Sequence, residues 1–309
     1  MRSVRAHFQY TVYIIAAQIS SAACAYPANG GVFLMIIEDV GNFSVSKTFD
    51  CGQCFRFDPV PGEEECFEGV AFGNYARFHR TDGGLEITDG ADRLFWTHFL
   101  SLDEDYGAID GKIRTSLGSE RDRAFMNSAV DHGAGIRILR QDPWETLISF
   151  IISQNNNIPR IKKIIAALCE RYGEDIGGGR YSFPTPEAIL GAGEEGLFEL
   201  RCGFRAPYIY DAARRVVSGE TDLEKVAGLR QYEDADAELR KIKGVGPKVS
   251  ACVLLFGFGR KDAFPIDVWM KRIMEKRFPD GLDYRRFGEY AGVAQQYLFY
   301  YERWLGGGD

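Results

Sequence analysis

The sequence predicts an α+β protein, in which an N-terminal antiparallel β-sheet domain precedes a mainly α-helical region. Short alternating runs of apolar and polar residues between about 42 and 90 are typical of half-buried strands. From about residue 91 the apolar residues recur with the period of a helix, and from 142 this pattern is strong. We expect the sheet domain to occupy residues 35–135 and the helical region residues 136–309.

Three runs in the first part have the strand pattern, at 66–72, 75–79 and 85–88. The turn-forming residues Thr81-Asp82-Gly83-Gly84 separate the last two runs. Because a short turn joins neighbouring strands, we expect the strands to be antiparallel.

The helical region begins with a well-marked helix. Asp142 is a suitable N-cap, Pro143 takes the first helical position and Glu145 follows three residues after the cap. The apolar face of this helix is formed by Trp144, Leu147, Ile148 and Ile151. A second helix is expected after Pro159. The asparagines at 155–157 between the two helices favour a turn.

The segment GVGPKVSAC at 244–252 predicts a helix, a tight glycine turn and a second helix, at about 237–257. Gly244 and Gly246 allow positive φ and close approach of a partner. The free N–H groups at the start of the second helix, with those of Gly244, Val245 and Gly246, form a candidate phosphate contact. Lys248 lies in the first turn of this helix, and PIDVWMKR places Asp267 nineteen residues later.

The net charge of −7, from 37 basic and 44 acidic residues, excludes a protein held to nucleic acid mainly by bulk charge. Basic residues nevertheless cluster around the hairpin and the segment after it: Lys241, Lys243, Lys248, Lys271, Arg272, Lys276 and Arg277. A positive strip on an acidic body indicates directed contact with nucleic acid. The alternative for any one of these residues is a solvated helix face.

Residues 1–34 differ from the rest of the chain. Arg2 and Arg5 precede an apolar run at 10–17, and Ala23-Cys24-Ala25 has the pattern of a secretory cleavage site. Because the apolar run is short, we interpret this segment as a disordered extension or an incorrectly assigned start, with Met35 as the natural first residue, and not as a signal. No apolar run reaches the ~18 to 20 residues that a membrane span requires.

The seven cysteines form no regular framework, and Cys51 and Cys54 lack the strand-then-helix context of a redox C-x-x-C motif. The four histidines are widely dispersed, which argues against a zinc site. The sequence also contains no phosphate loop, dinucleotide fingerprint or serine elbow. We therefore expect no metal site.

The hairpin with Lys248 and Asp267 resembles the helix-hairpin-helix (HhH-GPD) DNA glycosylases, and further stretches resemble their 8-oxoguanine DNA glycosylase family. These stretches are GQCFRF at 52–57, QDPWE with SQNNNIPRI within 141–161, GFRAPYI at 203–209 and AGVAQQYLF at 291–299. The resemblance covers the chain from about Met35 to its end. It implies a bifunctional glycosylase and abasic-site lyase that excises 8-oxoguanine opposite cytosine from duplex DNA in base excision repair.

The resemblance also implies roles for single residues in chemistry and in holding DNA. Lys248 would attack the flipped nucleotide, and Asp267 would stabilise the developing sugar cation and cap the following helix. Phe204 matches the family's wedge and Asn155 the residue that fills the vacated space. Arg160 and Arg205 match the two arginines that grip the orphaned cytosine.

A pocket for the damaged base is implied by four other matches. The carbonyl of Gly52 would accept the N7 hydrogen that distinguishes 8-oxoguanine from guanine. Gln295 would read the base edge, and Phe299 and Cys252 would stack on its two faces. For Cys252, simple core packing is the alternative. Trp269 departs from the family, since the animal enzymes have histidine there, and its contact with phosphate is open.

The resemblance implies no cofactor and a monomer acting on DNA without a membrane. No cysteine follows Cys252, so the iron–sulfur cluster of some relatives has no ligands here. A structural cation at the hairpin backbone is left open. In a prokaryote we expect a cytoplasmic, nucleoid-associated protein. Two alternatives remain, a glycosylase for another lesion and a DNA-binding module without catalysis.

Overall fold

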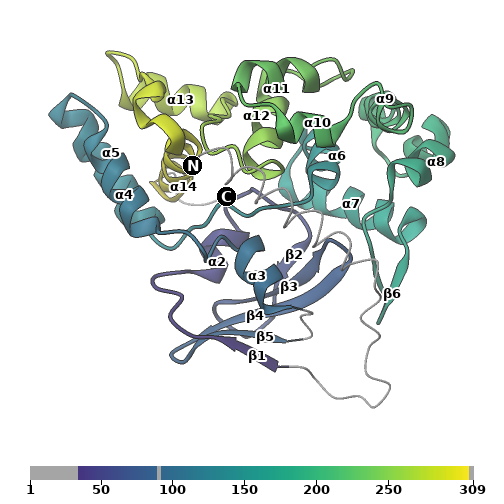
Figure 1. Cartoon of the computed structure of the whole chain (residues 1–309), viewed down its shortest axis with the longest axis horizontal. Coiled ribbons are helices and arrows are strands. Elements are labelled where there is room, and N and C mark those ends of the chain that lie inside the picture. Colours follow the sequence, from purple (N-terminus) through teal and green to yellow (C-terminus); the bar gives the residue numbers. More distant parts are fainter. Residues whose placement is uncertain (1–33, 89–91, 306–309) are drawn as a thin grey trace.

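The computed structural model describes residues 34–88 and 92–305 of the 309-residue chain. The interpretation of residues 1–34 as an extension therefore lies outside the described residues, except for Leu34. A β-sheet packs beneath a larger group of helices (Figure 1). The predicted order of an N-terminal antiparallel sheet followed by a mainly helical region is confirmed.

The sheet has five antiparallel strands in the order β1-β5-β4-β3-β2. They are β1 (Leu34–Ile37), β2 (Phe57–Pro59), β3 (Cys66–Ala71), β4 (Asn74–Thr81) and β5 (Gly84–Thr88). The three predicted strands correspond to β3, β4 and β5, and Asp82-Gly83 forms the tight turn between the last two. The edge strands β1 and β2 were not predicted, because three or four residues are too few to show an alternating pattern.

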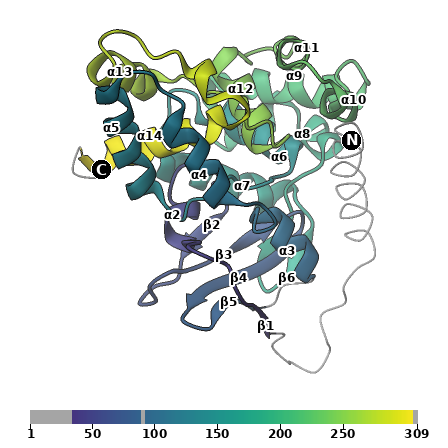
Figure 2. The same ribbon diagram turned by 60° about the vertical axis from the view of Figure 1, so that its left-hand side comes forward.

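Helices occupy most of the remaining chain, and a turned view shows them as a layer over the sheet (Figure 2). Those before residue 140 are α2 (Val45–Phe49), α3 (Arg93–Phe99), α4 (Tyr106–Thr115) and α5 (Glu120–Gly133). Those that follow are α6 (Pro143–Ser153), α7 (Ile158–Tyr172), α8 (Pro186–Glu199), α9 (Ala206–Val217), α10 (Leu223–Gly228), α11 (Tyr232–Leu239), α12 (Pro247–Phe256), α13 (Val268–Arg277) and α14 (Ala291–Leu305). The connections include a small hairpin, β6 (Asp175–Gly177) with β7 (Arg180–Tyr181), and the 3-10 helices η1 (Gly203–Arg205) and η2 (Tyr284–Tyr290).

Two hydrophobic cores underlie these layers. The sheet core is rich in aromatic rings, with Phe49, Phe57 and Phe78 in mutual contact at 4.5 to 5.7 Å between centroids. The second core joins the helices, and α4 and α5 contribute Ile109, Met126 and other side chains to it. The helices α4 and α5 precede residue 135 in sequence, but they pack with the helical core. The domain boundary at residue 135 stays a prediction.

The predicted start of α6 is confirmed, because the Asp142 carboxylate accepts a hydrogen bond from the Glu145 N–H at 2.7 Å. The next helix begins at Ile158 and so includes Pro159 instead of starting after it, because Asn157 caps it by accepting from the Arg160 N–H at 3.0 Å. Asn155 lies in the predicted turn with a positive φ of 49°, a conformation that asparagine tolerates.

Candidate active site at the helical hairpin

The predicted hairpin is formed by α11, a turn and α12, and its two glycines serve different purposes. Gly244 has φ +82°, and a Cβ there would lie 2.3 Å from the Tyr208 ring. Gly246 is the N-cap of α12 with φ −94°, so the expectation of a positive φ is wrong for this residue. Among the described residues no atom lies within 4 Å of a Cβ placed on Gly246. A ligand can therefore approach the backbone closely at Gly246, whereas the Val245 N–H already donates to the Ile242 carbonyl at 3.1 Å.

Lys248 projects from the first turn of α12 toward the end of α6. Its Nζ donates a hydrogen bond to the Ser153 hydroxyl at 3.5 Å and lies 5.1 Å from the centroid of the Phe150 ring. The side chain is half-buried. The amine has one long hydrogen bond to a hydroxyl and an aromatic ring nearby, and no ion-pair partner among the described residues. It is therefore accessible to a reacting carbon.

Asp267 is the N-cap of α13, as predicted, and its Oδ1 accepts from the Met270 N–H at 2.7 Å. One carboxylate oxygen thus fixes the helix start. A carboxylate held in this way keeps its charge at a defined position, which suits the stabilisation of a nearby cation.

Cys252 lies one turn after Lys248 on α12, and the charges of both Lys248 and Asp267 act on its buried thiol. Burial raises the pKa of Cys252 to about 11, while the charge of Lys248 lowers this pKa and that of Asp267 raises it. Both charges therefore act on the same sulfur. Cys252 is only 3 % exposed and belongs to the helical core, so core packing and base stacking both remain compatible with its position.

Gly52 and Phe299, which are 247 residues apart in sequence, meet in space. Gly52 has φ +83°, and a Cβ there would lie 3.9 Å from Cε1 of Phe299. Gln295, one turn earlier on α14, is 6 % exposed. Its Oε1 is buried and has no hydrogen-bond partner among the described residues. A buried acceptor without a protein partner is free to accept a hydrogen bond from water or from a ligand.

Of the four residues assigned to the space left by the flipped nucleotide and to its partner base, Phe204 and Arg205 lie on η1, Asn155 lies on the α6–α7 turn and Arg160 lies in the first turn of α7. Phe204 is 51 % exposed, and Asn155 and Arg160 are exposed as well. Arg205 differs, because its side chain is buried. Its Nε donates to the Gln154 carbonyl and its Nη2 to the Asn155 carbonyl, both at 2.8 Å. In this structure Arg205 therefore supports the turn that presents Asn155, a role that sequence reasoning missed.

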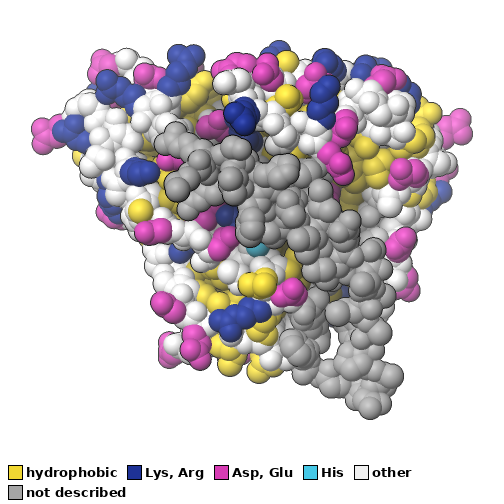
Figure 3. Space-filling view, viewed as in Figure 1, with side chains coloured by type: hydrophobic (Ala, Val, Ile, Leu, Met, Phe, Trp, Pro, Cys, Tyr) yellow, Lys and Arg dark blue, Asp and Glu magenta, His cyan; other side chains and the backbone are white. Residues whose placement is uncertain are grey.

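Acidic side chains pair with several of the basic residues around the hairpin, so this strip carries less unpaired positive charge than the sequence suggests. Lys241 pairs with Glu238 at 2.6 Å, and Lys276 and Arg277 both pair with Glu302. Lysine and arginine side chains still recur along the upper edge of the molecule, among acidic ones (Figure 3). The Arg272 guanidinium lies 5.5 Å from the centroid of the Trp269 ring, and Trp269 is 46 % exposed.

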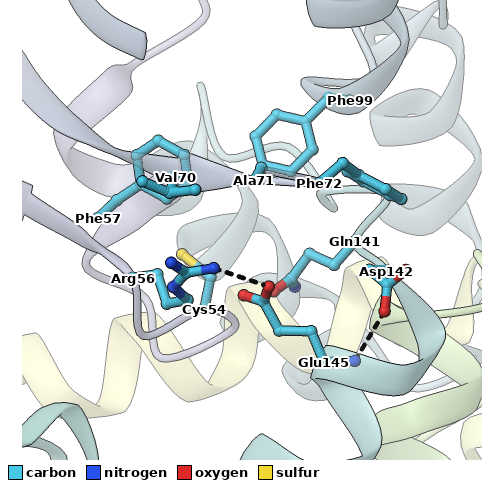
Figure 4. Close-up of a pocket in the computed structure, with 10 residues that line it drawn as sticks. All are labelled: Cys54, Arg56, Phe57, Val70, Ala71, Phe72, Phe99, Gln141, Asp142 and Glu145. Atoms are coloured by element: carbon cyan, nitrogen blue, oxygen red, sulfur yellow. Dashed lines mark hydrogen bonds and ion pairs between the residues drawn. The ribbon is translucent and has the colours of Figure 1, made fainter. Parts of the chain in front are cut away.

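A small cleft of about 10 Å³ lies between the sheet and the start of α6, and none of the predicted site residues line it (Figure 4). Arg56 forms an ion pair with Glu145 there at 3.2 Å and also donates to the Tyr181 carbonyl. Burial raises the pKa of Glu145 to about 7, although Arg56 opposes this shift. The cleft is therefore a charged junction between the two cores and not the reaction site.

We expect Glu145 to make stability depend on pH. Its pKa is higher in the folded protein than the ordinary value of 4.5, so its contribution is full below pH 4.5 and is lost as pH rises through about 7. Between pH 5 and pH 8 the wild type should lose about 2 to 3 kcal/mol of unfolding free energy relative to Glu145→Gln. Urea unfolding of both proteins at the two pH values measures this difference, and a difference that stays constant with pH contradicts the assignment.

The described cysteines are free and buried. Burial raises the pKa of Cys51 to about 12, which opposes the thiolate that a redox C-x-x-C motif needs. Among the described residues, Glu63, Cys66 and His79 form the one group close enough to hold a metal ion. The Arg77 guanidinium donates to both Glu63 and Cys66 and supplies positive charge there already. No helix in the described ranges is long and apolar enough to cross a membrane.

The comparisons with known proteins agree with this geometry. Residues 148–280 match the HhH-GPD superfamily of base excision DNA repair proteins. Residues 35–147 match the N-terminal domain of 8-oxoguanine DNA glycosylase. The class of protein is thus a helix-hairpin-helix DNA repair protein. Within that class, the chain belongs to the 8-oxoguanine DNA glycosylase family.

Similar proteins include the N-glycosylase/DNA lyase of Saccharomyces cerevisiae, 43% identical over 171 residues that cover 51% of this chain and 45% of the yeast protein. A probable N-glycosylase/DNA lyase of Methanothermobacter thermautotrophicus is 32% identical over 211 residues, covering 58% of this chain and 67% of that protein. The matched segment thus spans about half to two thirds of these relatives.

A solved structure of the Clostridium acetobutylicum 8-oxoguanine glycosylase/lyase superposes with a TM-score of 0.79 at 37% identity. The match covers 88% of this chain and 98% of that one, which was solved with double-stranded DNA containing cytosine opposite 8-oxoguanine. A structure of MBOgg1 with a low-affinity DNA ligand matches equally well, with a TM-score of 0.79, 38% identity and coverage of 91% and 98%.

Proposed function

We propose that the protein is a bifunctional DNA glycosylase and abasic-site lyase that removes 8-oxoguanine opposite cytosine from duplex DNA in base excision repair. The observation that carries this proposal is the placement of the Lys248 amine in the first turn of the hairpin helix α12, with the Ser153 hydroxyl as its hydrogen-bond partner, together with the Asp267 carboxylate held at the start of α13. A primary amine and a carboxylate in one site provide a nucleophile and a group that stabilises a cation. The activities named for the yeast and clostridial relatives support the same chemistry.

Base recognition is assigned to the pocket between the Gly52 loop and α14. The Gly52 carbonyl would accept the N7 hydrogen of 8-oxoguanine, whereas it would repel the unprotonated N7 of guanine. The unpartnered Oε1 of Gln295 provides an acceptor for a donor on the base edge. Phe299 lies beside Gly52, so one ring face of the flipped base would stack on it.

The reaction then follows from Lys248. Its neutral amine attacks C1′ of the flipped nucleotide, and the bond from C1′ to the base breaks with the electron pair leaving on the base, which takes up a proton. The free carboxylate oxygen of Asp267 stabilises the positive charge on the sugar. Opening of the sugar gives an imine between Lys248 and C1′. Loss of a proton from C2′ then expels the 3′ phosphate by β-elimination.

DNA would contact the hairpin turn at the N-terminus of α12 and the exposed side chains of Phe204, Asn155 and Arg160. The amides of Gly244, Val245 and Gly246 would contact a backbone phosphate, which requires the Val245 N–H to release the Ile242 carbonyl that it bonds at 3.1 Å. Phe204 would enter the stack left by the flipped nucleotide. Arg205 would grip the orphaned cytosine only if it exchanged its carbonyl partners at 154 and 155 for the base.

We propose that the protein acts as a monomer and needs no cofactor, with a cation at the hairpin backbone as an optional structural addition. In a prokaryotic cell it would work in the cytoplasm at the nucleoid. The acidic net charge fits such a role only through local contacts, and binding should therefore weaken steeply with salt.

Borohydride trapping tests the function directly. The wild-type protein is incubated with duplexes carrying 8-oxoguanine opposite cytosine, 8-oxoguanine opposite adenine, an oxidised pyrimidine or no lesion. We expect a covalent adduct with 8-oxoguanine opposite cytosine and none with undamaged DNA. An adduct confined to the oxidised pyrimidine would keep the mechanism and replace the substrate. DNA binding without any adduct would indicate a module without catalysis.

A further inference from the structure

A side chain outside the predicted pocket holds the loop that carries Gly52. Gln296 is 2 % exposed, and its Nε2 donates a hydrogen bond of 2.7 Å to the carbonyl of Cys51. The two residues are 245 positions apart in sequence. This bond connects the base-reading helix α14 with the peptide immediately before Gly52.

The residue after Gly52 is anchored from the opposite direction. Gln53 is fully buried, and its Nε2 donates to the carbonyls of Thr48 at 2.9 Å and Arg137 at 2.8 Å. Its Oε1 accepts from the Leu139 N–H at 2.8 Å. Gly52, which has the greatest backbone freedom of any residue type, is therefore held between two fixed neighbours.

The loop also lies where the two cores meet. Cys51 belongs to the helical core and Cys54 to the sheet core. The side chain of Gln141, seen at the cleft in Figure 4, donates to the Gln53 carbonyl at 2.7 Å from the side of α6. Two bonds reach this loop from α14, the helix that carries Gln295 and Phe299. Arg303 donates to the Asp50 carbonyl at 3.1 Å, and Gln296 donates to the Cys51 carbonyl, in the peptide directly before Gly52.

We propose that Gln296 is a positioning residue for base recognition, which holds the Gly52 carbonyl at a fixed place relative to Gln295 and Phe299. The inference rests on the proposed function, because it assigns Gly52 to the damaged base. A carbonyl that shifts by a fraction of an ångström no longer aligns with the N7 hydrogen, and hydrogen bonds weaken steeply when misaligned. Gln296 itself touches no reacting atom and acts only through the Cys51–Gly52 peptide.

The test compares two substrates that differ in whether a base must be read. One duplex carries 8-oxoguanine opposite cytosine, and the other carries a preformed abasic site opposite cytosine. Both require Lys248, but only the first requires the Gly52 pocket. Single-turnover rates with excess enzyme give the ratio of 8-oxoguanine excision to abasic-site cleavage for each protein.

Gln296→Met keeps the size of the side chain and removes the donor. We expect its excision of 8-oxoguanine to fall by about tenfold, with abasic-site cleavage within about twofold of wild type. Gln141→Met is the matched control, since it loses a bond of equal length to the same loop from the segment just before α6. Its ratio of the two rates should stay within about threefold of wild type.

An unchanged ratio in Gln296→Met would overturn the proposal, and so would an equal fall in Gln141→Met, because loop anchoring in general would then be responsible. Abasic-site cleavage and circular dichroism report on folding, and Gln296→Ala replaces the methionine variant if the larger side chain does not fit. A wild-type protein that cleaves abasic DNA but leaves 8-oxoguanine intact would overturn the proposed substrate, and the inference with it. If the wild type excises 8-oxoguanine and one of the first two outcomes is found, the inference about Gln296 fails while the proposed function stands.

Discussion

Replacing Lys248 with glutamine is expected to abolish the borohydride-trapped adduct and to slow base excision by at least about 10³-fold. Glutamine is polar and one atom shorter than lysine, and its amide cannot form an imine. Because Lys248 is only half-buried and Ser153 is its single hydrogen-bond partner in the described structure, the fold should tolerate the change. Gel analysis of trapped complexes and single-turnover excision measure the two effects.

Binding to 8-oxoguanine DNA should survive in Lys248→Gln, since the pocket residues Gly52, Gln295 and Phe299 are unchanged. Lys225→Gln on α10 is the matched control, because it makes the same charge change at an exposed position that this site does not use. The control should form the adduct at the wild-type rate. An adduct that persists in Lys248→Gln would show that another amine is the nucleophile.

Much of the fold could be predicted because its signals are local. The cap at Asp142, the strand runs that became β3 to β5 and the glycine turn before α12 each lie within a few residues of sequence. The positions of Lys248 and Asp267 at helix starts follow from the same kind of signal. Local patterns such as these record the backbone preferences of short segments.

The parts that were missed depend on contacts between distant segments. Arg205 lies in a stretch that gives no sign of its bonds to the carbonyls of residues 154 and 155, about 50 residues earlier. The bond from Gln296 to Cys51 spans 245 residues, and an isolated glutamine carries no local signal of it. The packing of α4 and α5 with the helical core likewise depends on which apolar faces meet, and periodicity alone does not specify that.

The alternatives for Cys252 show a further limit. Its spacing on the apolar face of α12 predicts burial, and the structure confirms burial at 3 % exposure. Yet the charges of Lys248 and Asp267, the two residues proposed for catalysis, also act on its thiol. Core packing and a role in the base pocket are thus both compatible with the position of Cys252. Only a substitution that affects one role and not the other can assign its function.

At Asp267, substitution can distinguish the N-cap role from the catalytic role, because the two roles depend on different properties of the side chain. As an N-cap it needs an oxygen that accepts from the Met270 N–H, which it does at 2.7 Å. As a catalytic group it needs negative charge near the sugar. Asparagine keeps the accepting oxygen and removes the charge, whereas alanine removes both.

We expect Asp267→Asn to excise 8-oxoguanine about 10²- to 10³-fold more slowly than wild type. Its unfolding free energy should stay within about 0.5 kcal/mol of the wild-type value. Asp267→Ala should be equally slow and should also lose about 1 kcal/mol of stability, because the cap is gone. Single-turnover excision and urea unfolding of the two variants measure both properties. If Asp267→Asn were as fast as wild type while Asp267→Ala was destabilised, the carboxylate would serve the helix start alone, and the sugar cation would have to be stabilised by another group.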